Sequence, residues 1–132
     1  MSTDYDVIII GAGPGGYVAG IRAAQLRLKA VVIEKDQPGG VCLNWGCIPS
    51  KNLIHQAEVF HSMKEMEAVG VGIDRDSLDY AKVQANSRQV AKTLVNGVNG
   101  LLKKNKVALI KGTAVISGKG EVTVDGREKP GT

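Results

Sequence analysis

The feature that most constrains the fold of this chain is a glycine-rich turn placed between a predicted strand and a predicted helix. Residues 5–10 form a β-branched apolar run that ends in the turn, residues 14–28 follow as a helix with small residues on one face, and residues 29–34 form a second apolar run. Apolar runs of this kind are typical of strands in parallel sheets. A strand, a helix and a strand within about 30 residues form a βαβ unit. The sequence therefore predicts an α/β fold built on a Rossmann-like dinucleotide-binding unit.

The turn itself has the G-x-G-x-x-G spacing of a phosphate-binding loop. Gly11 permits a tight turn, Gly13 lets the main chain approach a pyrophosphate, and Gly16 permits close packing of helix on strand. The helix that follows presents free N–H groups and a positive dipole end to phosphates. We expect the loop and its first helical turn, Gly11, Gly13, Pro14, Gly15 and Gly16, to bind the pyrophosphate of a dinucleotide.

An acidic residue stands where such a fold places its ribose-binding carboxylate. Glu34 ends the second predicted strand, 23 positions after Gly11, near the spacing of ~20 expected for this contact. A carboxylate there accepts hydrogen bonds from ribose hydroxyls and disfavours the 2′-phosphate of NADP. The alternative is an ordinary glycine turn beside a surface glutamate. The motif alone does not separate FAD from NAD.

The remainder of the chain predicts two long helices and three short strands. The first helix begins between Cys47 and Pro49 and ends near residue 69, and a short extended piece covers 71–73. The second helix spans 80–104 and carries an apolar stripe. Strands at 107–110, 113–116 and 121–124 are separated by glycine turns and predict a β-meander. The stripe consists of Val83, Val90, Leu94, Val98 and Leu101.

The strand count indicates a truncated sheet. A dinucleotide-binding sheet has the strand order 3-2-1-4-5-6. The segment 107–110 supplies a third parallel strand, and no further segment supplies the fourth. The first strand is then left with an uncovered apolar edge, which natural proteins avoid. We expect that the chain is a fragment or that something else covers this edge.

The two cysteines of the chain lie close together in the loop and helix start that follow Glu34. Cys42 and Cys47 have four residues between them, and a disulfide that closes so short a loop adds little stability. The helix start stabilises a thiolate at Cys47, and Lys51 lies one turn further along the same face. Redox exchange is one interpretation. A zinc site that includes His55 or His61 and a pair of inert buried thiols are the others.

Charge and hydropathy disfavour several classes of protein. The net charge is +4 and the pI is about 9.1, but the basic residues are scattered and the one local run, residues 103–106, fits a helix C-terminus. No aromatic residues interleave with that run, which disfavours nucleic-acid binding. No stretch approaches the ~20 apolar residues of a membrane span, and the N-terminus shows no signal peptide. A cytoplasmic location is expected.

The segment G-G-V-C-L-N-W-G-C-I-P-S-K, with G-A-G-P-G-G and Glu34 upstream, resembles the flavin disulfide reductase family. Its residue choices are similar to the dihydrolipoamide dehydrogenase branch, with mercuric and glutathione reductases as alternatives. The resemblance covers the whole chain. It implies that residues 1–132 are the N-terminal part of an FAD-binding domain and that the NAD-binding and dimerisation domains are absent. A non-catalytic dinucleotide-binding fragment is the other reading.

The resemblance also implies roles for individual residues. Cys42 matches the interchange thiol that meets the substrate disulfide, Cys47 the charge-transfer thiol against the flavin, and Lys51 the lysine near flavin N5. Gly112 and Ala114 match main-chain contacts to the adenine end. The residues expected to line FAD between the second strand and the cysteine pair are Glu34, Lys35, Gly39, Gly40, Val41 and Cys42.

The same family pattern implies partners. The parent enzyme uses FAD, and uses NAD through a domain missing here. It forms a homodimer and serves a lipoyl-bearing acyltransferase subunit of a 2-oxoacid dehydrogenase complex. No metal is expected. The family's catalytic histidine lies in a later region, and His55 and His61 do not match it. We therefore expect the chain alone to be inactive.

Overall fold

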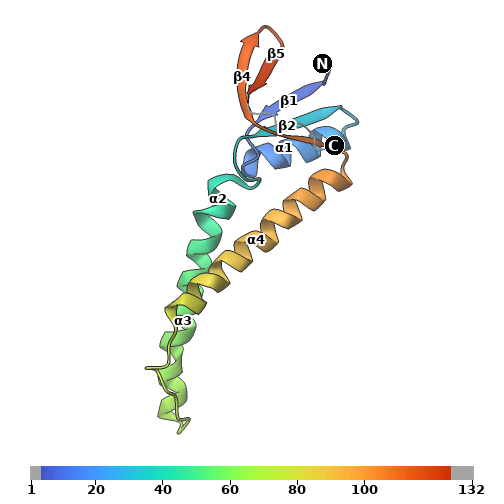
Figure 1. Ribbon diagram of the computed structural model, residues 1–132. Helices are drawn as coiled ribbons and strands as arrows, with labels where there is room; N and C mark the ends of the chain where they lie inside the picture. Colours follow the sequence, from blue (N-terminus) through green and yellow to red (C-terminus); the bar gives the residue numbers. More distant parts are fainter. Residues whose placement is uncertain (1–3, 126–132) are drawn as a thin grey trace, which may run out of the picture.

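The computed structural model describes residues 4–125. Residues 1–3, which belong to the N-terminal segment that shows no signal peptide pattern, lie outside this range. The elements in chain order are β1 (Val7–Ile10), α1 (Pro14–Gln25), β2 (Ala30–Glu34), α2 (Gly40–Asn44), α3 (Cys47–Ala68), α4 (Tyr80–Lys104), β3 (Ala108–Lys111), β4 (Thr113–Gly118) and β5 (Glu121–Asp125) (Figure 1).

Strands β1, β2 and β3 form one parallel sheet with β2 in the centre. Val7 pairs with Ala30 and Val31 pairs with Ala108. Because neighbours flank β2 on both sides, its residues 30–33 are buried. The predicted βαβ unit and the third parallel strand are both confirmed.

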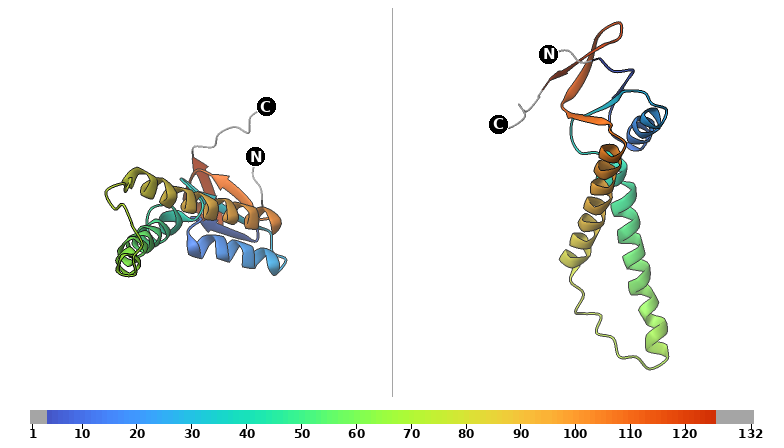
Figure 2. Two further views of the ribbon diagram at one scale, coloured as in Figure 1. Left: turned by 90° about the horizontal axis from the view of Figure 1, so that it is seen from below. Right: turned by 90° about the vertical axis from the view of Figure 1, so that its right-hand side faces the viewer.

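Helices α1 and α4 pack against one another and against the sheet. The hairpin β4–β5 lies on the opposite side of the sheet from α1, as the right-hand view of Figure 2 shows. Small residues let α1 lie close to β2, because a Cβ at Gly20 would come 2.8 Å from Val32 Cγ2. The core cluster of buried residues comprises Ala12, Ala23, Ala30, Val32, Leu43, Val95, Val98, Leu102 and Val107.

Beyond the sheet, α3 and α4 run side by side as a long helical pair that projects away from the strands (Figure 1). The start of α4 is capped by Asp79, whose carboxylate accepts a hydrogen bond from Ala81 N at 2.9 Å. The C-terminal half of α4 lies next to the sheet, and α3 begins beside α2.

The predicted β-meander is wrong, because the last three strands belong to two sheets. β3 pairs with β2, whereas β4 and β5 form a separate antiparallel pair. The break occurs at Gly112, whose φ of +151° is accessible to glycine and strained for other residues. Its N–H donates to Glu34 O at 2.9 Å, so the chain leaves the parallel sheet directly beside the end of β2.

Strand β1 is less buried than its sequence predicts. Residues 7–9 are half-buried and Ile10 is 52% exposed. The physical reason is its position, because β1 lies at an edge of the described sheet and has a neighbour on one side only. The uncovered apolar edge expected from the strand count is therefore present.

Two further expectations need correction. The apolar stripe on α4 is displaced, since Leu94 and Leu101 are 41% and 47% exposed while Ala91 and Leu102 are buried. The segment between β2 and α3, expected to be a loop, contains the short helix α2. The complete set of buried α4 residues is Ser87, Ala91, Val95, Val98 and Leu102.

Candidate dinucleotide and disulfide site

The glycine loop connects the end of β1 to the start of α1 in the conformation that its sequence predicts. Gly11 has a φ of +94°, and its N–H donates to Ile33 O at 2.7 Å. A Cβ at Gly16 would lie 1.8 Å from Gly11 O. No side chain fits there without moving the glycine loop. Gly16 therefore lets the first helical turn of α1 contact this loop directly.

The opposite side of this loop is open. A Cβ at Gly13 or Gly15 would meet no atom within 4 Å. Gly13 is the N-cap of α1, Pro14 is its first residue, and no side chain caps the helix. Main-chain N–H groups at a helix start can bind phosphate oxygens. The loop therefore has both the space and the donors that a pyrophosphate needs.

Glu34 joins this loop to the end of β2. Its Oε2 atom accepts a hydrogen bond from Ala12 N at 2.7 Å, and its Oε1 atom accepts one from Asp36 N at 2.9 Å. A carboxylate has about four lone-pair positions, so further positions remain for other donors. The two main-chain bonds hold the carboxylate at the mouth of a pocket.

That pocket has a volume of about 340 Å³ and lies where three segments of the chain meet. It combines the glycine turn, the end of β2 and the start of β4. Five of the residues predicted to bind cofactor line it together, and the sequence patterns did not indicate the other three, Ile10, Ile33 and Thr113. The lining residues are Ile10, Gly11, Ile33, Glu34, Lys35, Gly112, Thr113 and Ala114.

A second glycine turn packs against the first. Gly39 N donates to Ala12 O at 2.7 Å. Gly40 has a φ of +57°, and a Cβ there would lie 2.9 Å from Gly13 Cα. The Gly39–Gly40 turn leads directly into α2, which carries Val41, exposed, and Cys42. The glycine loop thus lies between the Glu34 pocket and the cysteine-bearing segment.

The cysteines come together at the junction of α2 and α3. Both are free thiols; Cys42 is half-buried, and Cys47 is exposed as the first residue of α3. A hydrogen bond with the Cys47 side chain raises the pKa of the Cys42 thiol, burial raises it further, and the charge of Lys51 opposes both effects. Cys47 and Lys51 therefore both lie near enough to Cys42 to influence its thiol.

The zinc interpretation gains no support. Within residues 4–125, no three His, Cys, Asp or Glu side chains gather into a group that could hold a metal ion. His55 and His61 lie at exposed positions on α3.

In the same described part of the chain, residues 4–125, no helix has the length and apolar character needed to cross a membrane.

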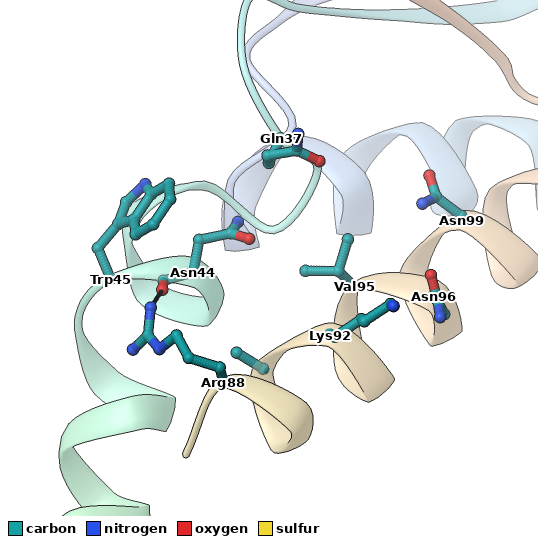
Figure 3. A pocket seen from close by; sticks show the side chains of 9 residues that line it. Gln37, Asn44, Trp45, Arg88, Lys92, Val95, Asn96 and Asn99 are labelled. Carbon is teal, nitrogen blue, oxygen red and sulfur yellow. Dashed lines mark hydrogen bonds between the residues drawn. The ribbon is translucent and has the colours of Figure 1, made fainter. Parts of the chain in front are cut away.

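Helix α4 contributes residues that sequence analysis missed. A second pocket, of about 390 Å³, lies between the loop after β2, α2 and α4, and is drawn in Figure 3. Arg88 on its wall donates a hydrogen bond to Asn44 O, the last carbonyl of α2. No local pattern marks Arg88, because its partner is 44 positions away in sequence.

Known proteins match nearly the whole of this chain. Residues 5–130 match the family model described as pyridine nucleotide-disulphide oxidoreductase. The dihydrolipoyl dehydrogenase of Zymomonas mobilis is 48% identical over 98% of this chain and 28% of its own length. That of Bacillus subtilis is 49% identical over 89% of this chain and 25% of its own length.

A solved structure supports the fold. LpdA from Mycobacterium tuberculosis superimposes with a TM-score of 0.74 and 24% identity, over 84% of this chain and 25% of that one. The chain thus spans about a quarter of the length of these relatives. Because the family model covers nearly all of its residues, the chain belongs to the pyridine nucleotide-disulphide oxidoreductase family.

Proposed function

We propose that this chain is the N-terminal part of the FAD-binding domain of a dihydrolipoamide dehydrogenase. The observation that carries the proposal is the position of the glycine loop, which contacts the Glu34 carboxylate on one side and the Gly39–Gly40 turn on the other. A dinucleotide lying along this loop would have its adenosine end at the Glu34 pocket and its other end toward the cysteines. The names of the relatives favour dihydrolipoamide over glutathione or mercuric ion as the substrate.

Different groups of residues would bind different parts of the dinucleotide. Glu34 and Lys35, with Gly112 and Ala114, would hold the adenosine part in the 340 Å³ pocket. The turn of Gly11 and Gly13 and the first helical turn of Pro14, Gly15 and Gly16 would bind the pyrophosphate. The segment Gly39, Gly40 and Val41 would line the cofactor on the way to Cys42 and Cys47.

The chemistry proposed for the cysteine pair is a two-electron exchange. The dithiol of dihydrolipoamide becomes a disulfide and gives two electrons and two protons to the Cys42–Cys47 disulfide, which becomes a dithiol. Cys42 would exchange with the substrate, Cys47 would contact the flavin, and Lys51 would lie near flavin N5. FAD, when bound, supplies the route by which the electron pair reaches NAD⁺ as a hydride.

The wider setting is also part of the proposal. NAD binding and dimerisation would lie in domains outside these 132 residues, since the chain spans about a quarter of its relatives. The substrate dihydrolipoamide would be carried by the acyltransferase subunit of a 2-oxoacid dehydrogenase complex in the cytoplasm, and the enzyme would be a homodimer.

The Glu34 pocket is tested by comparing the affinity of the chain for ADP and for 2′-deoxy-ADP by titration calorimetry. We expect ADP to bind about tenfold more tightly, because the missing hydroxyl removes a hydrogen bond to a charged group. Glu34→Gln should abolish most of this preference. Glu58→Gln, which makes the same charge change at an exposed position of α3, should keep it.

Equal affinity of the unaltered chain for the two nucleotides would contradict the ribose contact. The cofactor of the full-length parent protein is identified separately by denaturing that protein and analysing the released small molecule. FAD is expected, and release of FMN would exclude the proposed adenosine site.

A further inference from the structure

The turn that joins the two cysteine-bearing helices is held from outside by α4. The Arg88 side chain donates from Nη1 to Asn44 O at 2.9 Å (Figure 3). The Asn44 amide in turn donates from Nδ2 to Pro38 O at 3.1 Å and to Gly40 O at 2.9 Å. These bonds connect α4, the end of α2 and the turn before α2 into one hydrogen-bonded unit around Cys42.

The residue before Arg88 contacts the other side of the turn. Ser87 is 1% exposed, and its hydroxyl donates to Pro49 O at 3.4 Å. Asn44 and Pro49 lie on either side of Cys47. Two neighbouring residues of α4 therefore fix a main-chain carbonyl at each end of the segment that contains the second cysteine.

The helix that carries Arg88 is packed into the core. The half of α4 that follows Arg88 is fixed in the hydrophobic core by Val95, Val98 and Leu102, all buried. Arg88 is an exposed side chain with a long, flexible stem. Fixing this side chain in one conformation to bind the Asn44 carbonyl costs conformational entropy. A charge-assisted bond of this kind is stronger than a neutral one, so it can restrain the turn.

A restrained turn affects the equilibrium between dithiol and disulfide. A disulfide requires its two sulfurs about 2.0 Å apart with a defined dihedral angle. A segment that already holds Cys42 beside Cys47 loses little further freedom when the bond forms, whereas a loose segment loses more. Holding the turn therefore stabilises the disulfide relative to the dithiol.

We propose that Arg88 is a positioning residue that lowers the reduction potential of the Cys42–Cys47 pair by holding Asn44. The proposal rests on the proposed function only in that the pair cycles between dithiol and disulfide. Arg88 acts through the main chain of α2 and needs no contact with substrate or cofactor.

The positive charge of Arg88 gives an alternative explanation with the opposite sign. A cation near the pair stabilises thiolates and therefore the reduced state, which raises the potential. Removing only a charge effect would make the potential more negative. Removing the positional effect would make it less negative, so the direction of the shift separates the two explanations.

The experiment equilibrates the chain with mixtures of oxidised and reduced dithiothreitol and quantifies free thiols by alkylation and mass spectrometry. In the reaction, the two thiols lose two electrons and two protons to the cyclic disulfide of dithiothreitol, which becomes a dithiol. Arg88→Met should weaken the Cys42–Cys47 disulfide about threefold to tenfold, which corresponds to ~15–30 mV toward less negative potential.

Matched variants separate position from charge and from general destabilisation. Lys92→Met removes a cation from the wall of the same pocket and should leave the potential unchanged. Arg88→Lys, which keeps a donor, should recover part of the shift. Ser87→Ala should shift the potential in the same direction by a smaller amount, and it tests the restraint should Arg88→Met fail to fold.

Several results would overturn the proposal. One is an unchanged potential in Arg88→Met with a wild-type circular dichroism spectrum, and another is a shift toward more negative potential. An equal shift toward less negative potential in Lys92→Met would show that the effect does not depend on the hydrogen bond from Arg88 to Asn44. Failure of every variant and of the unaltered chain to form the intramolecular disulfide would reject the proposed redox function as well.

Discussion

At the scale of single residues, several side chains and glycines serve two parts of the site at once. Glu34 is the predicted ribose ligand, and its carboxylate also accepts the Ala12 N–H in the phosphate loop. Gly40 gives its turn a left-handed conformation and leaves room for Gly13. A substitution at either position is therefore expected to disturb the loop as well as the ligand contact.

The cysteine pair permits a test by pH dependence. The pKa of the Cys42 thiol is raised, so its alkylation by iodoacetamide should rise at higher pH than for an ordinary cysteine, since the thiolate is the reactive form. Cys47→Ala removes the hydrogen bond that is the main cause, and should move the midpoint of the rate profile to lower pH.

The matched variant for this test is Lys51→Met. Lys51 lowers the pKa of Cys42, so its removal should move the midpoint to higher pH. Peptide mass spectrometry assigns the alkylation to Cys42. Identical midpoints in both variants and the unaltered chain would show that the thiols do not interact.

At the scale of elements, α4 connects the core to the cysteine segment. Its buried face contacts the sheet and α1 through Val98 and Leu102, and its start lies along α3. The residues that hold Asn44 and Pro49 lie on the same helix. Changes in the packing of α4 are therefore expected to change the conformation of the segment around Cys42 and Cys47.

The corrected apolar stripe of α4 gives a test with an internal control. Leu102 is 1% exposed, and Leu102→Ala leaves a cavity in the core, which should lower the free energy of unfolding by about 2–5 kcal/mol. Leu101 is 47% exposed, and Leu101→Ala should change it by only about 0.5 kcal/mol. Urea denaturation followed by circular dichroism measures both, and a larger effect at Leu101 would restore the stripe expected from sequence.

At the scale of the whole molecule, strand β1 forms one edge of the described sheet and has no strand on its outer side. β1 has β2 as its neighbour on one side, and Ile10 is 52% exposed. A pocket of about 380 Å³ lies between β1 and the hairpin, lined in part by Ile8, Ile10 and Ile116. This apolar edge belongs to the same strand that carries the phosphate loop.

The molecular extent of the chain leads to a prediction about activity. The chain spans about a quarter of its relatives, and we place NAD binding outside it. We therefore expect no NAD⁺-dependent oxidation of dihydrolipoamide by the purified 132-residue chain, measured by NADH absorbance. A full-length dihydrolipoyl dehydrogenase is the positive control. Turnover at ~1 per second or faster, within the usual range for enzymes, would refute this expectation.

The sequence by itself determined the features that depend on neighbouring residues. The order of strand and helix around Gly11, the span of α4 at residues 80–104 and the helix start at Cys47 all agree with the structure, because periodicity, turn residues and helix signals are local. The association of Glu34 with the glycine loop and of Cys42 with Cys47 followed from motifs of known spacing.

Only the tertiary structure decided the contacts between distant segments. It placed β1 at the edge, separated the β4–β5 hairpin from the parallel sheet and selected Leu102 rather than Leu101 for the core. It also joined Arg88 to Asn44. These outcomes depend on which surfaces meet when α4 packs on the sheet. A local sequence pattern does not distinguish between two helix faces that differ by a rotation of one residue.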